Sequence, residues 1–194
     1  MDEAAEAYEA KAREYLTARE RSNIGSKEVA DWSKTLGENA TVVDLACGGG
    51  YPITSALNDS GLRIWAVDSS PSLVEVFQSR FPEIPVQCKR VQDFDFFDRK
   101  FDAAIAIGLV FLLSEEDQVT LISRVSKVLN PGGRFLFSAP NKVAIWDDVC
   151  TGSLSRSLGK FKYEEILTTA GFRVRAAFTD TGNNNYFNAV LAQA

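Results

Sequence analysis

The stretch that decides the fold is Val43-Asp44-Leu45-Ala46-Cys47-Gly48-Gly49-Gly50, in which a short apolar segment runs directly into three glycines. Residues 41–45 are mostly β-branched and apolar, which predicts a buried strand, and residues 51–57 predict a helix that tolerates Pro52 in its first turn. Small residues between the two elements let the backbone approach a ligand closely, and the start of a helix offers free N–H groups to a carboxylate. This order predicts a ligand site at the end of the first strand of an α/β domain.

The rest of the sequence alternates between apolar runs and helical patterns. Further strands are expected at residues 62–67, 85–89, 102–107, 134–138, 173–179 and 186–191, and helices at 4–19, 27–36, 73–80, 114–129 and 163–170. The polar link 180–185 has the composition of a hairpin turn, which makes the last strand antiparallel. The sequence therefore predicts a doubly wound α/β fold with a mostly parallel seven-stranded sheet, an antiparallel last strand and helices on both faces.

Length and composition favour one domain. The 194 residues are 45% hydrophobic, which suits a single globular unit with a sizeable core. This domain is expected over residues 1–194, with residues 1–37 as an N-terminal helical lid and residues 139–160 as an irregular loop on the substrate side. Because no apolar run reaches the ~18 to 20 residues of a membrane span and the acidic start does not resemble a signal peptide, a cytoplasmic protein without membrane contact is expected.

The net charge, the spacing of the cysteines and the absence of histidine exclude several functions. The net charge of −5 argues against nucleic acid as a partner, because binding phosphates needs a basic face. Three widely spaced cysteines without a CxxC pair favour reduced thiols and argue against structural zinc, so no metal site is expected. Since the sequence contains no histidine, any proton transfer must use a carboxylate, Tyr, Lys, Cys or water.

A second acid stands where the second predicted strand ends. Asp68 follows Trp65-Ala66-Val67 and lies 18 residues after Gly50. A carboxylate at this place accepts both hydroxyls of a ribose in a bidentate pair. The alternative is a plain helix N-cap, which is common for an Asp at the start of a helix.

Together the two features resemble the class I S-adenosylmethionine-dependent methyltransferases. Their first motif is acid-x-Gly-x-Gly-x-Gly, and here Ala46 stands in the place of the first glycine. A dinucleotide fingerprint would instead space its glycines as GxGxxG. The resemblance covers the chain from about Tyr8 to Val190 and implies a Rossmann-like methyltransferase fold with S-adenosylmethionine as the cofactor. Residues 146–159 resemble a small bacterial subgroup whose acceptor the resemblance does not identify.

The resemblance also implies a set of cofactor contacts. The glycine turn would wrap the methionine part of the cofactor, Asp68 would hold the ribose, and Leu73 would lie under the adenine. Gln92 would accept from the adenine amino group, with a polar surface loop as the alternative, and Cys47 is expected to be a small tolerated residue. The implied cofactor-binding residues are Asp44, Ala46, Cys47, Gly48, Gly50, Asp68, Ser69, Leu73, Val91, Gln92 and Ile107.

The acceptor site is expected between the N-terminal segment and the segments after the fourth and fifth strands. Tyr15 would place its ring face on the sulfonium, and Phe111 and Trp146 would suit a flat or apolar acceptor. Asp147 and Asp148 would act as a general base or metal ligand, and Tyr186 would donate its hydroxyl to the acceptor. Each has a plainer alternative as a packing, turn or solvated residue.

The predicted function is transfer of a methyl group from S-adenosylmethionine to a small molecule by in-line displacement, in a monomer or homodimer. A base-methylating enzyme would carry Asn/Asp-Pro-Pro-aromatic after the fourth strand, where this chain has Gly108-Leu109-Val110-Phe111. A non-catalytic cofactor-binding or regulatory protein that keeps the fold is the alternative. A nicotinamide dehydrogenase is a third possibility, against which the glycine spacing argues.

Overall fold

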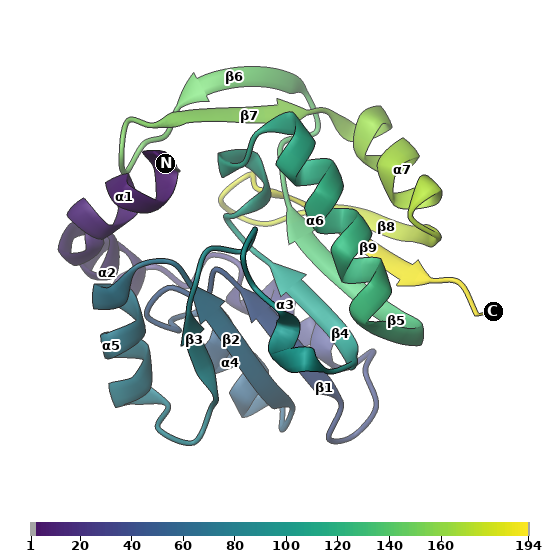
Figure 1. Ribbon diagram of the computed structural model, residues 1–194, viewed down its shortest axis with the longest axis horizontal. Coiled ribbons are helices and arrows are strands. Elements are labelled where there is room, and N and C mark those ends of the chain that lie inside the picture. The colour runs from purple at the N-terminus through teal and green to yellow at the C-terminus, as the bar shows by residue number, and fades with distance from the viewer. Residues whose placement is uncertain (1–2, 194) are drawn as a thin grey trace.

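A computed structural model describes residues 3–193 of the chain, so the ends of the predicted domain at residues 1–2 and 194 lie outside the described part. Seven strands form the central sheet (Figure 1), in the order β3-β2-β1-β4-β5-β9-β8. They are β1 (Thr41–Leu45), β2 (Arg63–Asp68), β3 (Val86–Cys88), β4 (Phe101–Ala106), β5 (Leu129–Ser138), β8 (Phe172–Thr179) and β9 (Asn185–Leu191). Strand β9 pairs antiparallel with both β5 and β8, and the other pairs are parallel. The predicted sheet and its antiparallel last strand are confirmed.

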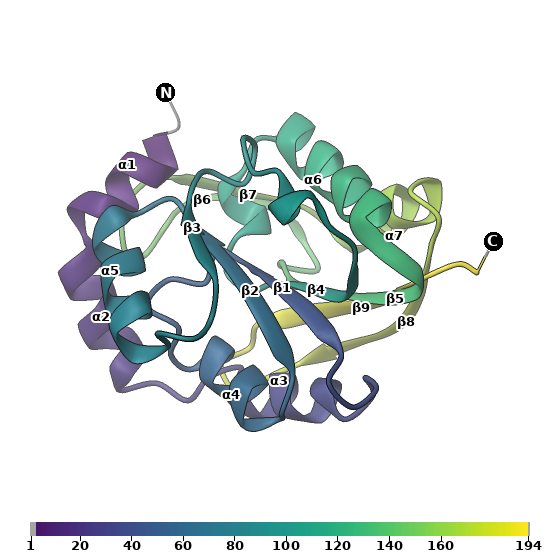
Figure 2. The ribbon, with the colours of Figure 1, turned by 60° about the horizontal axis from the view of Figure 1, so that its bottom comes forward.

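Helices cover both faces of this sheet (Figure 2). α3 (Ser26–Ser33), α4 (Ile53–Asp59) and α5 (Pro71–Arg80) lie on one face, and α6 (Glu115–Val128) and α7 (Lys160–Thr169) on the other. Short 3-10 turns, η1 (Phe96–Asp98) and η2 (Val110–Leu112), flank β4. Because β1 and β4 are central, their side chains are buried on both faces, as the apolar sequence 102–107 predicts. None of the helices in residues 3–193 is long and apolar enough to cross a bilayer.

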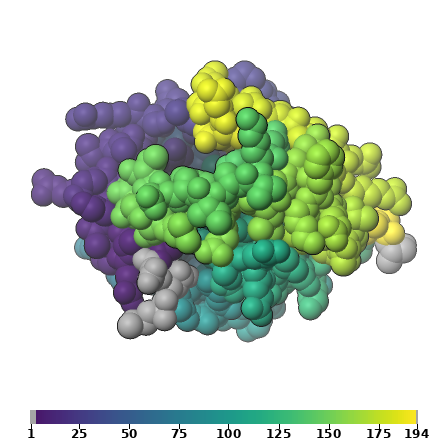
Figure 3. All heavy atoms as spheres, turned by 90° about the horizontal axis from the view of Figure 1, so that it is seen from above, coloured from purple at the N-terminus to yellow at the C-terminus, as the bar shows by residue number. Residues whose placement is uncertain are grey.

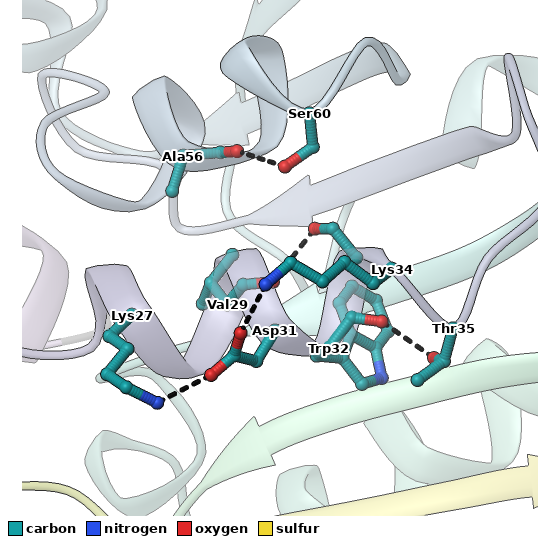
Figure 4. Close-up of polar contacts among 9 residues, drawn as sticks. Lys27, Val29, Asp31, Trp32, Lys34, Thr35, Ala56 and Ser60 are labelled. Atoms are coloured by element: carbon teal, nitrogen blue, oxygen red, sulfur yellow. Dashed lines mark hydrogen bonds and ion pairs between the residues drawn. The ribbon is translucent and has the colours of Figure 1, made fainter.

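Helix α3 shows how an amphipathic sequence fixes its own orientation. Val29 and Trp32 are buried against the sheet, and the Trp32 indole N–H donates to the Asn188 side chain at 3.3 Å. On the outer side the Asp31 carboxylate bridges Lys27 at 2.6 Å and Lys34 at 2.7 Å (Figure 4). Such exposed pairs contribute little, so the buried Trp32 and Val29 hold the helix in place.

The N-terminal segment differs from the single helix expected at residues 4–19. It forms two helices, α1 (Glu3–Ala10) and α2 (Ala12–Glu20), which meet at Lys11, where φ is −112° and ψ is 13°. Both helices lie beside α5, at the edge of the molecule where the N-terminus is (Figure 1). The bend lets α1 contact the start of α5 while α2 covers the glycine turn, a tertiary arrangement that helix periodicity does not encode.

The prediction of an irregular loop at residues 139–160 is wrong. The chain there forms a two-stranded antiparallel sheet of β6 (Val143–Asp147) and β7 (Leu154–Leu158), which covers the top of the molecule (Figures 1 and 3). The usual alternation of buried apolar and exposed polar side chains is inverted in this hairpin: Val143 and Ile145 are exposed, whereas Ser155 and Ser157 are buried. The exposed apolar residues of β6 and the buried serines of β7 obscure the usual strand pattern. Strand β5 also begins earlier than the strand expected at residues 134–138, because it starts at Leu129 and carries a register shift against β4.

Candidate active site

A cavity of about 350 Å³ opens where the central parallel strands end, beneath α1, α2 and the β6–β7 hairpin. This is the edge at which ligands bind in open α/β sheets. The predicted site residues that line it are Tyr15, Ala46, Asp68, Ser69, Leu73, Val91, Gln92, Ile107 and Tyr186. The predicted site residues that are not among its lining residues are Asp44, Cys47, Gly48, Gly50, Trp146 and Asp147.

The glycine turn is fastened to the neighbouring strand. The backbone N–H groups of Ala46 and Cys47 both donate to the Val67 carbonyl of β2, at 2.8 and 3.1 Å. Ala46 adopts a φ of 64°, in the left-handed region where a side chain carries a conformational cost that glycine avoids, which accounts for the glycine usual at this place. Burial raises the pKa of the Cys47 thiol well above its ordinary value, so this residue is an inert packing group.

Asp68 joins the two halves of the site. Its Oδ2 accepts from the Gly48 N–H at 2.8 Å, and its Oδ1 accepts from the Ser70 N–H at 2.9 Å. Burial raises the pKa of this carboxyl, while these main-chain donors act in the opposite direction. Each carboxylate oxygen keeps a second lone pair, so Asp68 remains able to accept from two hydroxyls in the cavity.

Asp44 lies beneath the turn and not in the cavity. It is fully buried, and its Oδ2 accepts from the Thr54 hydroxyl at 2.7 Å. Burial raises the pKa of Asp44 to about 7, against the lowering effect of the Thr54 hydrogen bond and with a further rise from the Asp68 charge. Asp44 therefore connects β1 to α4 as a support for the turn.

The raised pKa of Asp44 predicts a pH dependence of stability. An acid whose folded-state pKa is raised binds its proton more tightly in the folded chain, so its contribution destabilises the fold progressively as pH rises from about 4 to about 7. We expect Asp44→Asn to gain stability relative to wild type at pH 8 by roughly 2–3 kcal/mol more than at pH 5, because two pH units of that window separate pH 5 from the raised pKa. Thermal unfolding at both pH values measures this, with the exposed Asp59→Asn as the control. An equal difference at both pH values would contradict the assignment.

Helix α2 closes over the glycine turn. A Cβ at Gly48 would lie 3.1 Å from Tyr15 Cε1, and one at Gly49 would lie 2.4 Å from Leu16 Cδ2. The contacts explain why the turn carries glycine at these places. Burial raises the pKa of the Tyr15 hydroxyl to about 12, so the ring is a neutral wall of the cavity.

Tyr186 reaches the cavity from β9, but its hydroxyl hydrogen is already engaged. The hydroxyl donates to Asp180 Oδ2 at 2.8 Å, and the ring stacks on Phe178 with centroids 5.1 Å apart. Asp180 also accepts from the backbone N–H groups of Gly182 and Asn184. Donation from Tyr186 to an acceptor, as expected from the sequence, is therefore not available in this arrangement.

Trp146 and Asp147 are not in the positions expected of acceptor-site residues. Trp146 is half-buried and packs on the Phe111 ring, with the two ring centroids 5.6 Å apart. Of these two aromatic side chains, Phe111 lines the cavity. Asp147 is exposed, because side chains alternate along β6. The next residue, Asp148, is buried and lines the cavity instead; it accepts from the N–H groups of Cys150 and Thr151 and, at 3.4 Å, from the Tyr8 hydroxyl.

Sequence reasoning missed Arg19. This residue lies one helical turn after Tyr15 on α2 and lines the cavity. Its buried Nε has no hydrogen-bond partner, and the guanidinium makes no ion pair with any residue of the 3–193 segment. The i, i+4 spacing from Tyr15 was the signal that placed it on the same face.

The described part of the chain holds no group of three His, Cys, Asp or Glu side chains arranged to bind a metal ion. The cavity instead combines apolar walls with two carboxylates and one unpaired guanidinium. This composition suits an organic ligand that carries hydroxyl and carboxylate groups.

The sequence matches the model of a methyltransferase domain family over residues 42–133. A probable S-adenosylmethionine-dependent methyltransferase of Mycolicibacterium smegmatis is 27% identical over 136 residues, which are 69% of this chain and 52% of that protein. A tRNA N(3)-cytidine methyltransferase of Gallus gallus is 27% identical over 106 residues, which are 49% of this chain and 29% of that protein. The chain thus spans about half, or less, of the length of these two relatives.

Solved structures share the fold. The 1,6-didemethyltoxoflavin-N1-methyltransferase of Burkholderia thailandensis, solved with 1,6-didemethyltoxoflavin and S-adenosylhomocysteine, aligns with a TM-score of 0.71 and 20% identity, covering 87% of this chain and 79% of that one. The sheet order, the glycine turn, the acid at the end of β2 and the family match lead to one assignment. The match over residues 42–133, the methyltransferase relatives and the shared fold support a class I S-adenosylmethionine-dependent methyltransferase.

Proposed function

We propose that this chain binds S-adenosylmethionine in the cavity and transfers its methyl group to a small molecule by in-line displacement. The observation that carries the proposal is the position of Asp68, which lines the cavity and receives a hydrogen bond from the glycine turn. A carboxylate at the end of β2 beside a glycine turn at the end of β1 fits a ligand with a ribose and an amino-acid tail.

The apolar part of the cavity fits the adenine. Leu73 and Val91 are buried, and they line the cavity together with Asp68 and Ser69. Ser69 lies between Asp68 and the cap of α5, so its backbone is held in place at the cavity wall. The predicted adenine contacts of Leu73, Val91 and Gln92 are therefore compatible with a flat ring in this position.

The unpaired guanidinium of Arg19 fits the carboxylate of the amino-acid tail. A buried Nε without a partner is costly, and a bidentate carboxylate satisfies it with charge-assisted hydrogen bonds. Tyr15, one turn earlier on α2, covers the glycine turn that would wrap the same tail. Arg19 therefore joins the set of cofactor-binding residues that we propose.

Arg19→Gln is expected to weaken binding of S-adenosylhomocysteine by about 10-fold or more, which is the loss of one charge-assisted hydrogen bond. Binding of methylthioadenosine, which lacks the amino-acid tail, should not change. Calorimetric titration measures both ligands, and Arg13→Gln, an exposed change on the same helix, is the control. Equal weakening for both ligands would show that Arg19 supports the fold and not the carboxylate.

The chemistry that we propose depends on positioning. When bound, S-adenosylmethionine supplies a methyl group on a sulfonium, and the protein aligns the acceptor and excludes water. The two cavity carboxylates, Asp68 and Asp148, both accept hydrogen bonds from main-chain N–H groups, so we assign them a positioning role and not the role of a general base. The acceptor atom is thus expected to carry its lone pair unprotonated near neutral pH.

A small acceptor is supported by the net charge of −5 and by the apolar residues Ile24 and Phe111 in the cavity wall. The experiment follows a labelled methyl group from S-adenosylmethionine into small planar and thiol compounds and, in parallel, into bulk tRNA. We expect label in a small compound. Label in tRNA would overturn the small-molecule acceptor, and cofactor binding without transfer to either class would favour the non-catalytic alternative.

The chain's partners and segments belong to the same proposal. We expect a monomer or homodimer, which light scattering of the purified protein distinguishes from larger assemblies. We propose that helices α1 and α2 act as the lid expected from residues 1–37, and that the β6–β7 hairpin takes the acceptor-side role expected of a loop. Asp148 and Cys150 at its turn line the cavity, so this hairpin is the element that we expect to select the acceptor.

A further inference from the structure

Glu9 joins the lid to the start of α5. Its Oε2 accepts from the Ser70 hydroxyl in a short hydrogen bond and from the Ser72 N–H at 3.2 Å, and its Oε1 accepts from the Ser72 hydroxyl at 2.6 Å. Ser70 is the N-cap of α5 and accepts from the Leu73 N–H at 3.2 Å. A carboxylate from a separate helix therefore completes the cap of α5, at the end where the helix dipole favours negative charge.

The cap is continuous with the carboxylate of the cavity. The Ser70 N–H donates to Asp68 Oδ1 at 2.9 Å, and Asp68 Oδ2 accepts from the Gly48 N–H at 2.8 Å. Glu9, Ser70, Asp68 and Gly48 thus form one chain of hydrogen bonds from the lid to the glycine turn. A change at Glu9 acts on Asp68 through the position of Ser70, without touching the cavity itself.

Besides the packing of α2 over the glycine turn, few polar contacts hold the lid. Glu20 at the end of α2 pairs with Arg80, which also donates to the Gly49 carbonyl at 3.0 Å, and the Tyr8 hydroxyl lies 3.4 Å from Asp148. The joint at Lys11 has a single exposed ion pair, with Glu14 at 3.6 Å. Contacts of this kind are individually weak, so α1 opens from α5 without unfolding of the sheet.

We propose that Glu9 is the latch of the lid and a positioning residue for Asp68, so that closure of α1 onto α5 fixes the carboxylate that holds the cofactor. The inference rests on the proposed function for the identity of the ligand. Entry and release of the cofactor then require the contacts of Glu9 with Ser70 and Ser72 to break. The hydrogen bonds from Ser70 and Ser72 lower the pKa of Glu9, so the latch stays charged at neutral pH.

Lys11 and Arg13 at the joint between α1 and α2 provide a direct readout, because trypsin cleaves after both when the lid opens. We expect Glu9→Gln to speed this cleavage about fivefold without ligand and to raise the dissociation rate of S-adenosylhomocysteine by a similar factor, consistent with loss of a charged acceptor. Glu6→Gln is the matched control, since Glu6 is exposed on the same helix and loses the same charge. Ser72→Ala, alone and with Glu9→Gln, completes a double-mutant cycle in which the two changes are not additive.

The outcomes separate the latch from the proposed function. Equal cleavage and dissociation rates for Glu9→Gln and Glu6→Gln, with ligand binding intact, would overturn the latch alone. Absence of S-adenosylhomocysteine binding in the wild type would overturn the proposed function, while the cleavage rates without ligand would still test the closure of α1. A Glu9→Gln effect on the melting temperature without an effect on either rate would make Glu9 a purely structural cap and contradict the proposal.

Discussion

Replacing Asp68 with alanine is expected to weaken S-adenosylhomocysteine binding by at least about 100-fold, the equivalent of two hydrogen bonds to a charged group. The change removes the acceptor that we propose for the ribose hydroxyls, and it releases the N–H groups of Gly48 and Ser70 that Asp68 now holds. The binding partner and the geometry of the turn are therefore lost together. Calorimetric titration measures the dissociation constant.

Two variants keep this result interpretable. Asp68→Asn retains the shape and one acceptor oxygen, so it should fall between wild type and alanine. Asp59→Ala removes an exposed acid at the end of α4 and should bind like the wild type. A dissociation constant of Asp68→Ala within about threefold of the wild-type value would contradict the role of Asp68 in the cofactor site.

The largest effect on stability is expected from Gly50→Ala. Gly50 has a φ of 84°, and an added Cβ would lie 2.4 Å from Phe81 Cε2 and 3.1 Å from Phe77 Cδ2. A left-handed alanine costs about 1–2 kcal/mol, and crowding a packed aromatic pair costs about 1–3 kcal/mol more. We expect a loss of about 3 kcal/mol, which lowers the melting temperature by roughly 6–12 °C for a domain of this size.

Gly61→Ala separates the two causes. Gly61 has a similar φ of 73°, but a Cβ there would meet no atom within 4 Å. This variant should lose only the conformational part, about 1–2 kcal/mol. If both variants lost the same stability, the contact of Gly50 with Phe81 and Phe77 would not contribute, and the packing of α5 against the glycine turn would need another explanation.

The strands and the cofactor side of the cavity were predictable because local chemistry determines them. A β-branched run such as residues 41–45 has few alternatives to a buried strand, and an acid followed by small residues at the end of two adjacent strands places Asp44 and Asp68 together by topology. Their different roles were not predictable. Asp44 is buried beneath the turn and Asp68 faces the cavity, a distinction that depends on how α4 and α5 pack.

The acceptor side was less predictable because it depends on tertiary contacts between distant segments. On β7 of the hairpin, Ser157 is buried because its hydroxyl donates to the Pro140 carbonyl at 2.6 Å, a contact that no periodicity reveals. Asp147, the last residue of β6, is exposed, whereas the next residue, Asp148, is buried. The sequence alone likewise gives Glu9 as an exposed helix residue, because its contacts with Ser70 and Ser72 depend on how α1 packs against α5.

The central claim is that the cavity at the ends of β1 and β2 binds S-adenosylmethionine. Calorimetric titration of the purified protein with S-adenosylhomocysteine tests it most directly, with NAD titrated in parallel under the same conditions. We predict saturable binding of S-adenosylhomocysteine at one site per chain and no binding of NAD. Binding of NAD, or no binding of S-adenosylhomocysteine, would contradict the account.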